Sequence, residues 1–311
     1  MQNRAFLALV LLAGMALATL PLAAEGPAPS LSPHSDLIWS EPGDPHFGGF
    51  SAIKVTDDGA GFVALSDGGL VIQGLITRDG SGKITAVAAT APAAWLLGAR
   101  GKRLGDSEND TEGLAVLPDG TVFVSLEGPA RVLRYARLGG SATVLPVPGE
   151  FRGMQKNSSL EALAAADNGT LYTIPERSGR LERPFPIFRF REGSWDQPFV
   201  LPRDGTLLPV ASDIGPDGRL YVLEREFLGL AGFRTRLRSF GFGDAALGDE
   251  RLLLDTETGR HGNLEGVSVW RNRAGHLIAT MISDDNYEWF LATEIVEYDL
   301  GPTAAGVAKS G

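Results

Sequence analysis

Acidic side chains recur along this chain at intervals of roughly fifty residues. Each stands in a short apolar segment, and the four are Glu112, Glu161, Asp213 and Glu265. If the segments are copies of one structural unit, the four carboxylates converge, and like charges that close need a cation to offset their repulsion. The chain has no cysteine and 4 histidines. We therefore predict a metal site with oxygen ligands that binds a hard cation, most readily calcium.

The predicted metal set has a fifth member, Asp284, which ends the second apolar segment of the last copy. Glu112, Glu161 and Glu265 are also the candidate catalytic residues, because a carboxylate beside a metal can transfer a proton. A structural role stays open as the alternative. In that case the acids cap strand ends and accept hydrogen bonds from backbone N–H groups of the next copy.

Three arginines are candidates for binding an anionic substrate, because a guanidinium group holds phosphate or carboxylate oxygens well. They are Arg152, Arg177 and Arg225. Arg177 and Arg225 directly follow Glu176 and Glu224. Ordinary ion pairing within the molecule is therefore the competing interpretation for both of them.

The unit that must position these residues consists of short apolar strands joined by glycine turns. In the second copy, four strand-like runs cover residues 114–117, 121–126, 131–136 and 142–147. The dipeptide Asp119-Gly120 between the first two runs is typical of a hairpin turn. Four strands in about fifty residues is the length of one β-propeller blade.

The copies predict the number of blades. Five copies begin near residues 51, 112, 161, 213 and 265, and the last one is a strand short. Residues 36–40 can supply that strand by pairing with residues 293–300, which closes the ring and removes two open sheet edges. We therefore expect an all-β protein with a single five-bladed propeller closed by its N-terminal strand. A sixth blade within residues 70–110 is the alternative.

Composition narrows the classes of partner. Hydrophobic residues make up 43% of the chain and charged residues 21%, as in globular proteins. The formal net charge is -10, so nucleic acid and anionic membranes are poor partners. A cation suits the chain better.

The ends of the chain predict export. Residues 1–24 combine Arg4, an apolar run and a small-residue cleavage site before Glu25, which indicates a signal peptide rather than the alternative, a membrane anchor. We expect a disordered leader over residues 25–35, the propeller over 36–301 and a flexible tail over 302–311. The predicted location is periplasmic or secreted, with no stable membrane insertion after cleavage.

Seven segments together resemble the phytase-like family of exported bacterial proteins, also described as "esterase-like activity of phytase". They are Gly48-Gly49-Phe50-Ser51, residues 110–115, residues 157–163, Ser212-Asp213-Ile214, residues 223–227, residues 263–267 and residues 282–287. The resemblance spans about residues 47 to 300. It implies a propeller and the hydrolysis of an ester or a phosphoester.

Two functional hypotheses follow from the sequence. The first is a calcium-dependent hydrolase of a small anionic ester or phosphoester, acting at an acidic channel mouth where carboxylates hold the metal and arginine holds the anion. The second is a non-catalytic propeller that binds a ligand or a protein, with the acids serving blade packing. The fold alone does not choose between them.

Overall fold

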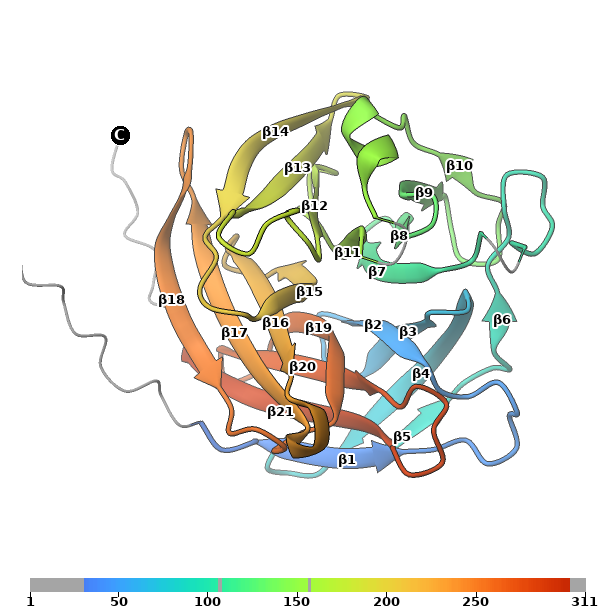
Figure 1. Ribbon diagram of the computed structural model, residues 1–311. Coiled ribbons are helices and arrows are strands. Elements are labelled where there is room, and N and C mark those ends of the chain that lie inside the picture. Colours follow the sequence, from blue (N-terminus) through green and yellow to red (C-terminus); the bar gives the residue numbers. More distant parts are fainter. Residues whose placement is uncertain (1–30, 106–107, 156–157, 303–311) are drawn as a thin grey trace, which may run out of the picture.

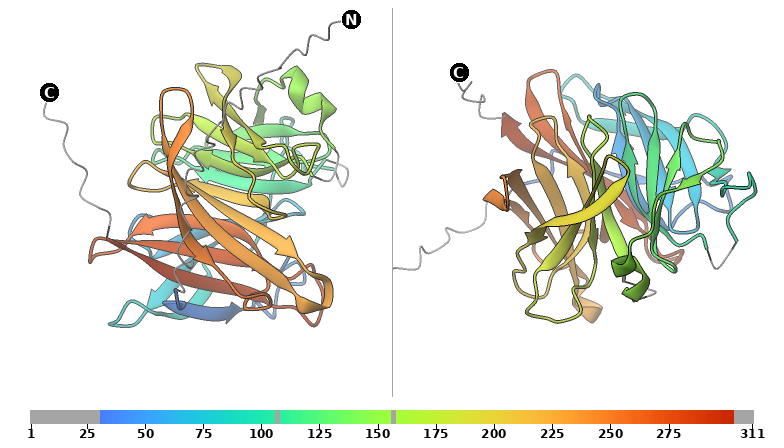
Figure 2. Two further views of the ribbon diagram at one scale, coloured as in Figure 1. Left: turned by 60° about the vertical axis from the view of Figure 1, so that its left-hand side comes forward. Right: turned by 90° about the horizontal axis from the view of Figure 1, so that it is seen from above.

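The computed structural model describes residues 31–105, 108–155 and 158–302. Five antiparallel sheets, each built on four strands, stand around a central axis, and consecutive sheets are neighbours in the ring (Figure 1). The view from above in Figure 2 shows the sheets side by side, each inclined to the next. This is a five-bladed β-propeller, as predicted.

The first three blades follow one another directly along the chain. Blade one contains β2 (Phe50–Val55), β3 (Gly61–Ser66), β4 (Leu70–Arg78) and β5 (Ile84–Ala89), with the short β6 (Ala94–Trp95) against β4. Blade two contains β7 (Thr111–Val116), β8 (Val122–Leu126), β9 (Arg131–Tyr135) and β10 (Thr143–Val144). Blade three contains β11 (Leu160–Ala165), β12 (Leu171–Pro175), β13 (Phe185–Arg191) and β14 (Ser194–Leu201).

The last two blades complete the circle. Blade four contains β15 (Leu208–Ile214), β16 (Leu220–Phe227), β17 (Phe233–Phe242) and β18 (Leu247–Asp255). Blade five contains β19 (Asn263–Arg271), β20 (His276–Asp284), β21 (Thr293–Pro302) and β1 (Ser35–Trp39). The helical elements of the described residues are two short 3-10 turns, Gly149–Gly153 and Gly229–Ala231.

The alternative of six blades is wrong. The strands between residues 70 and 110 are β4, β5 and β6, and all three belong to the sheet of blade one. The long first interval of the repeat is therefore a loop between blades. Beyond β6, which pairs with β4, this loop has an internal bridge between Leu97 and Arg103 and a bridge from Leu97 to Ser141 of blade two.

Closure of the ring by the N-terminal strand is confirmed. β1 pairs antiparallel with β21, from Ser35 opposite Glu297 to Trp39 opposite Thr293, and the two ribbons run side by side in Figure 1. Arg78 of blade one crosses to Glu297 of blade five with two hydrogen bonds of 2.5 and 2.8 Å. Glu297 is fully buried, so this charge-assisted pair ties the first blade to the last.

The hydrophobic core is divided among the five gaps between blades. One cluster, for example, joins Trp39, Phe50 and Phe62 to Trp270 and Ile295 across the gap between blades five and one. Four further clusters fill the other gaps in the same way. Alternating apolar residues on each strand supply these clusters, because successive side chains point to opposite faces of a sheet.

Glycine follows two of the repeated glutamates for a steric reason. A Cβ atom on Gly113 would lie 2.5 Å from Cβ of Leu163 on β11, and one on Gly266 would lie 2.8 Å from the backbone N of Ile53 on β2. The innermost strands of neighbouring blades therefore approach each other too closely for a side chain at these positions. The Glu-Gly pairs of the sequence mark this point on β7 and β19.

Several predictions concern residues outside the described part of the chain. The signal peptide over residues 1–24 and most of the leader lie there, as does the tail from residue 303. Within the described residues, β1 begins at Ser35, inside the predicted leader, and β21 ends at Pro302. No helix among the described residues is long and apolar enough to cross a membrane.

Candidate functional site

One end of the central channel gathers carboxylates from four blades. The first strand of each blade begins at this end, and the second strand returns to it, so the start of one meets the end of the other. We call this end the mouth and define it by two kinds of position. The strand-end position holds Asp67, Glu127, Glu176 and Asp284 in four blades, and the bulge position holds Glu112, Glu161 and Glu265 in three.

The bulge explains why the glutamates reach the channel. The pairing of first and second strands slips at the glutamates, for instance between Leu160 and Ala162 around Glu161. A similar irregularity surrounds Glu265 between Leu264 and Gly266. Such a bulge leaves a residue unpaired and re-aims its side chain, which is why bulges are common beside functional sites.

Three of the carboxylates lie close enough together to share one metal ion. One carboxylate oxygen from each of Asp110, Glu112 and Glu127 lies within 4.8 Å of the other two. Glu127 also accepts a hydrogen bond from the backbone N–H of Ser159 and interacts with Glu161. The side chains come from blade two and reach toward blade three.

The mouth holds more negative charge than its surroundings neutralise. Burial, followed by repulsion from Glu265, Glu127 and other carboxylates, raises the pKa of Glu112 well above its usual range. Burial and the charge of Glu112 do the same to the pKa of Glu161. Burial raises the pKa of Glu127 and that of Asp284 to about 7 each. Metal-binding carboxylates need a cation to stay ionised in such a setting.

One largely enclosed but still partly exposed cation, Arg225, stands among these acids. It takes the strand-end position of blade four, opposite Leu208, where the other blades carry a carboxylate. Its guanidinium group donates to Glu265 and to Asn263, and Nη2 lies 3.6 Å from Oε1 of Glu176. Arg225 therefore spans from blade three to blade five and holds Glu265 in place.

The structure brings four of the five predicted metal residues to the mouth: Glu112, Glu161, Glu265 and Asp284. Asn263 contacts two of them, donating to Oε1 of Glu265 over 2.9 Å and to Oδ2 of Asp284 over 3.4 Å. Asp284 also accepts from the backbone N–H of Asn286 at 2.7 Å. Asn263 thus links Glu265 and Asp284 by hydrogen bonds at the blade-five side of the mouth.

The predicted placement of Asp213 with the other acids is wrong. The bulge position of blade four is Val210, and Asp213 lies three residues further along β15, about 10 Å toward the opposite end. There its carboxylate accepts two hydrogen bonds from Nζ of Lys54, at 2.7 and 2.8 Å, and one from the backbone N–H of Val269 at 2.8 Å. We call this Lys54–Asp213 pair the floor of the channel.

The predicted substrate arginines have three different placements. Arg225 lies inside the mouth, as described. Arg177 is half exposed beside the mouth, with Nε 3.4 Å from Oε2 of Glu176 and 3.0 Å from Oγ of Ser158. Arg152 is exposed on the 3-10 turn Gly149–Gly153, whose Phe151 packs on Phe188 and Trp195 of the outer strands. Arg177 is the better placed to meet a substrate.

Sequence reasoning missed Asp110 and Glu127 as metal-site members. Glu127 carried a signal, because it ends the second strand of the blade that contains Glu112. Asp110 stands just before β7, in an acidic stretch that resembles the start of a calcium loop but departs from the EF-hand pattern at Thr111 and Leu117, so it was left out of the predicted metal set. Asp67 was missed as well, and burial raises its pKa beside Asp110 and Asp285.

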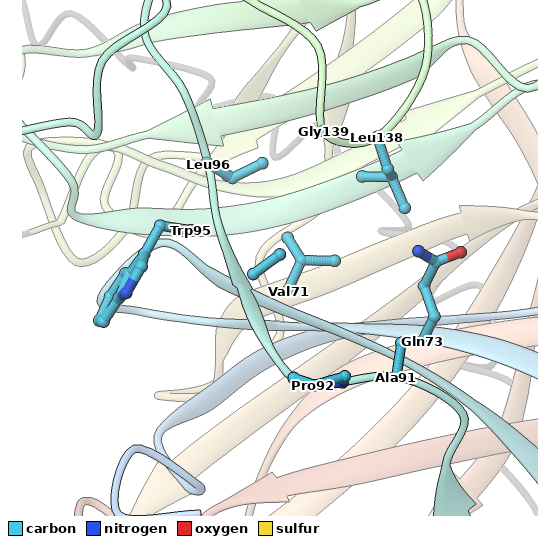
Figure 3. Close-up of a pocket in the computed structure, with 9 residues that line it drawn as sticks. Val71, Gln73, Ala91, Pro92, Trp95, Leu96, Leu138 and Gly139 are labelled. Carbon is cyan, nitrogen blue, oxygen red and sulfur yellow. The ribbon is translucent and has the colours of Figure 1, made fainter.

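A separate cavity of about 110 Å³ lies at the side of the ring, between blades one and two (Figure 3). Its lining is mainly apolar and includes Val71, Ala91, Pro92, Trp95, Leu96 and Leu138. Gln73 contributes a polar side chain. No titratable side chain faces it in this part of the structure. The cavity therefore offers no chemistry comparable with that of the mouth.

The fold and the site together define the class of protein: a five-bladed β-propeller with acidic residues at one opening of its central channel. Family comparison then specifies the group. The model of the phytase-like family, described as "esterase-like activity of phytase", matches residues 45–287. This chain belongs to that family.

Other comparisons add only likeness in fold. A search of curated proteins finds no match. Among solved structures, a protein of unknown function from Dyadobacter fermentans is 13% identical with a TM-score of 0.47, covering 86% of this chain and 87% of that one. The PQQ-bound aldose sugar dehydrogenase of Streptomyces coelicolor is 12% identical with a TM-score of 0.44, covering 86% and 99%. A gluconolactonase from Xanthomonas campestris is 15% identical with a TM-score of 0.40, covering 76% and 68%.

Proposed function

We propose that the mouth binds a divalent cation, calcium first, and that the protein hydrolyses a small anionic ester or phosphoester there. The observation that carries the proposal is the group Asp110, Glu112 and Glu127, whose oxygens lie within 4.8 Å of one another. Membership of a family described by esterase-like activity points the same way.

The residues of this group fit calcium. Calcium takes six to eight oxygen ligands from carboxylates, carbonyls and hydroxyls. Besides the three carboxylates, Oγ of Ser159 is buried and has no hydrogen-bond partner among the described residues. Ser159 is the residue whose N–H binds Glu127, so this hydroxyl belongs to the same neighbourhood. A softer metal would find neither thiolate nor imidazole ligands in the group.

The chain's own residues divide the work as follows. Asp110, Glu112 and Glu127 would hold the calcium ion, which would supply Lewis-acid polarisation of an ester or phosphoryl oxygen. Burial and the nearby Glu112 raise the pKa of Glu161, so its carboxyl group holds a proton more readily than a free one and can pass it to a leaving group. Arg225 positions Glu265, and the exposed Arg177 can bind the negative charge of the substrate.

Export belongs to the same proposal. The composition of residues 1–24 supports a signal peptide, and the absence of cysteine suits a periplasmic or secreted protein that needs no disulfides. A fusion of residues 1–30 to a reporter that folds only outside the cytoplasm tests this part. A reporter that stays in the cytoplasm contradicts it.

The decisive experiment measures calcium binding after chelator treatment. Calcium in hundredfold excess over its Kd should stabilise the protein by about 2.7 kcal/mol. Glu112→Gln combined with Glu265→Gln should abolish this gain and any hydrolysis of p-nitrophenyl phosphate or p-nitrophenyl acetate. Asp213→Asn, the same chemical change at the floor, should keep the calcium gain. No gain in the parent protein, or activity that survives both glutamate changes, overturns the proposal.

The second candidate function is a non-catalytic binding propeller. One observation favours it: some mouth acids already bind backbone groups, as Glu127 binds the N–H of Ser159 and Asp284 that of Asn286. Calcium binding without turnover of either ester would support this candidate.

A further inference from the structure

Large apolar side chains are exposed on two hairpins beside the mouth. Trp289 is 92% exposed and Leu230 is fully exposed. Four more join them at exposures from 44% to 65%: Phe227, Leu228, Tyr287 and Phe290. Within each hairpin these side chains follow one another closely along the chain, and exposed apolar groups that stand together, rather than singly, mark interaction surfaces.

The two hairpins rise from the acidic mouth itself. One connects β16 to β17 and begins two residues after Arg225, and the other connects β20 to β21 and begins directly after Asp284. Both therefore leave from the same end of the ring, on the neighbouring blades four and five (Figure 1). We call the six side chains the apolar rim.

The rim is local to one side of the mouth. The corresponding hairpins of blades one and two are tight turns, joining β3 to β4 and β8 to β9 through residues 67–69 and 127–130. Neither turn carries a large exposed apolar side chain, whereas the corresponding loop of blade three carries one, Leu181, at 74% exposure. Large exposed apolar side chains at this end therefore stand on the consecutive blades three, four and five, mostly on four and five, which gives the mouth a direction from which a partner can approach.

The rim is held in shape before any partner arrives. Trp289 packs edge-on against Phe290 with ring centroids 5.6 Å apart, and Phe227 packs on Phe233 at 4.9 Å. Asn286 and Tyr287 both adopt positive φ angles, 49° and 53°, which is uncommon for residues other than glycine. Backbone strain of this kind persists where the surrounding structure fixes it, and it gathers at binding sites.

Charge identifies the occupant. The mouth next to the rim carries the carboxylates Glu112, Glu161, Glu265 and Asp284 with one largely enclosed arginine, and the whole chain has a net charge of -10. A small anion can be held by Arg177 alone, but an acidic peptide or an anionic lipid surface would meet the negative charge of the whole mouth and be repelled. A partner with lysine or arginine beside apolar side chains satisfies both features at once.

We propose that the apolar rim and the mouth together dock a basic, apolar peptide segment of a partner protein. Aromatic or aliphatic side chains of the segment lie on Trp289, Leu230 and their neighbours, and its cationic side chains reach the carboxylates. Buried aromatic anchors supply most of the energy of such contacts, while the charges set orientation and rate of association. The inference does not depend on hydrolysis.

The test uses a short fluorescent peptide that alternates lysine with leucine and tryptophan, followed by anisotropy. Two matched peptides replace either lysine by glutamate or the apolar residues by serine. We expect the first peptide to bind and the other two to bind at least about tenfold more weakly. The rim variant Trp289→Ser with Leu230→Ser should lose about tenfold in affinity. The control variant Ile38→Ser with Val200→Ser changes exposed apolar residues on outer strands and should bind as the parent does.

Three results would overturn the inference. Equal loss in the rim and control variants means that binding is unspecific. Undiminished binding to the rim variant means that charge alone acts. Finally, the protein is sedimented with phosphatidylcholine vesicles, and if it binds them through Trp289 and Leu230 but ignores the peptide, the occupant is a lipid surface. Because the test reads binding, it can succeed even where both ester substrates fail.

Discussion

At the floor of the channel, Lys54 reaches from blade one across to Asp213 of blade four, and each charge meets its opposite. At the mouth, the same inner strands hold Glu112, Glu161 and Glu265 with Arg225 as the largely enclosed counter-charge. The floor thus behaves as an ordinary ion pair that helps to hold blades together. At the mouth, the carboxylates repel one another, and this repulsion destabilises the folded protein. The mouth is therefore the end of the channel suited to binding, and the floor is the end that contributes to stability.

The largest effect should come from removing the mouth's enclosed cation. Arg225→Met leaves Glu265, Glu176 and Asn263 without their partner. Breaking a buried ion pair costs about 3 kcal/mol or more, and although Arg225 is partly exposed, the loss of three partners at once should bring the cost to about 3 kcal/mol. The loss should shrink toward pH 5, where more of the mouth carboxyls are protonated. Urea unfolding at both pH values measures it. Arg177→Met, at a half-exposed position, serves as the control and should change stability by less than about 0.5 kcal/mol. Equal losses of stability for the two variants would mean that Arg225 inside the mouth contributes no more than the half-exposed Arg177 beside it.

The next effect concerns the floor. Lys54→Ala should destabilise the protein by about 2 kcal/mol, less than a fully buried pair costs because Lys54 is partly exposed. The calcium-induced rise in Tm should survive this change, since the floor lies at the opposite end. Thermal unfolding with and without calcium checks both points. Loss of the calcium effect would mean that the two ends are coupled.

The pH dependence of stability should report the mouth alone. Glu127 and Asp284 have pKa values raised to about 7 in the folded state, so the folded protein binds more protons than the unfolded chain above about pH 4. Stability without metal should therefore fall as the pH rises from about 4 to 7. Excess calcium should flatten this decline, because its binding to the ionised carboxylates offsets the repulsion among them. A stability that rises over the same range would contradict the charge pattern described for the mouth.

The smallest effect is a gain. Glu112→Gln removes one of the repelling carboxylates while keeping its shape, so in the absence of calcium the free energy of unfolding at pH 8 should rise by about 1 kcal/mol. Differential scanning calorimetry with chelator present measures it. Asp213→Asn is the matched change at the floor, and it should lower stability instead. If both substitutions changed the free energy of unfolding in the same direction, the proposed difference between the mouth and the floor would be wrong.

The sequence allowed the ring to be predicted because the blades repeat and because the last copy lacked a strand. It did not allow the register of blade four to be predicted. Val210 to Ile214 contains the same run of small, acidic and apolar residues as the other copies, displaced by three positions. Pairing with β16 decides which residue enters the mouth, and no local pattern on β15 reports its partner strand.

For the same reason, the sequence did not show which of the neighbours Glu224 and Arg225 faces the mouth. Neighbouring residues of a strand face opposite sides, so a shift of one position exchanges their roles. The structure turns Glu224 into the interior, where Arg236 and Arg238 bind it at 2.9 and 2.8 Å, and leaves Arg225 at the mouth. The grouping of Asp110 with Glu127 likewise depends on distances that only the folded chain defines.

Ring closure has a kinetic consequence. β1 pairs with β21, so Ser35 and Glu297 must meet although almost the whole described chain separates them. Contacts of such long sequence separation cost the most entropy to form and slow the search for the native state. The first strand has no partner until the last one is available, and blade five stays incomplete until then. We therefore expect refolding to end in a late step in which fluorescence of Trp39 changes, as this residue pairs with Thr293 and joins Trp270 and Ile295 in the cluster between blades five and one.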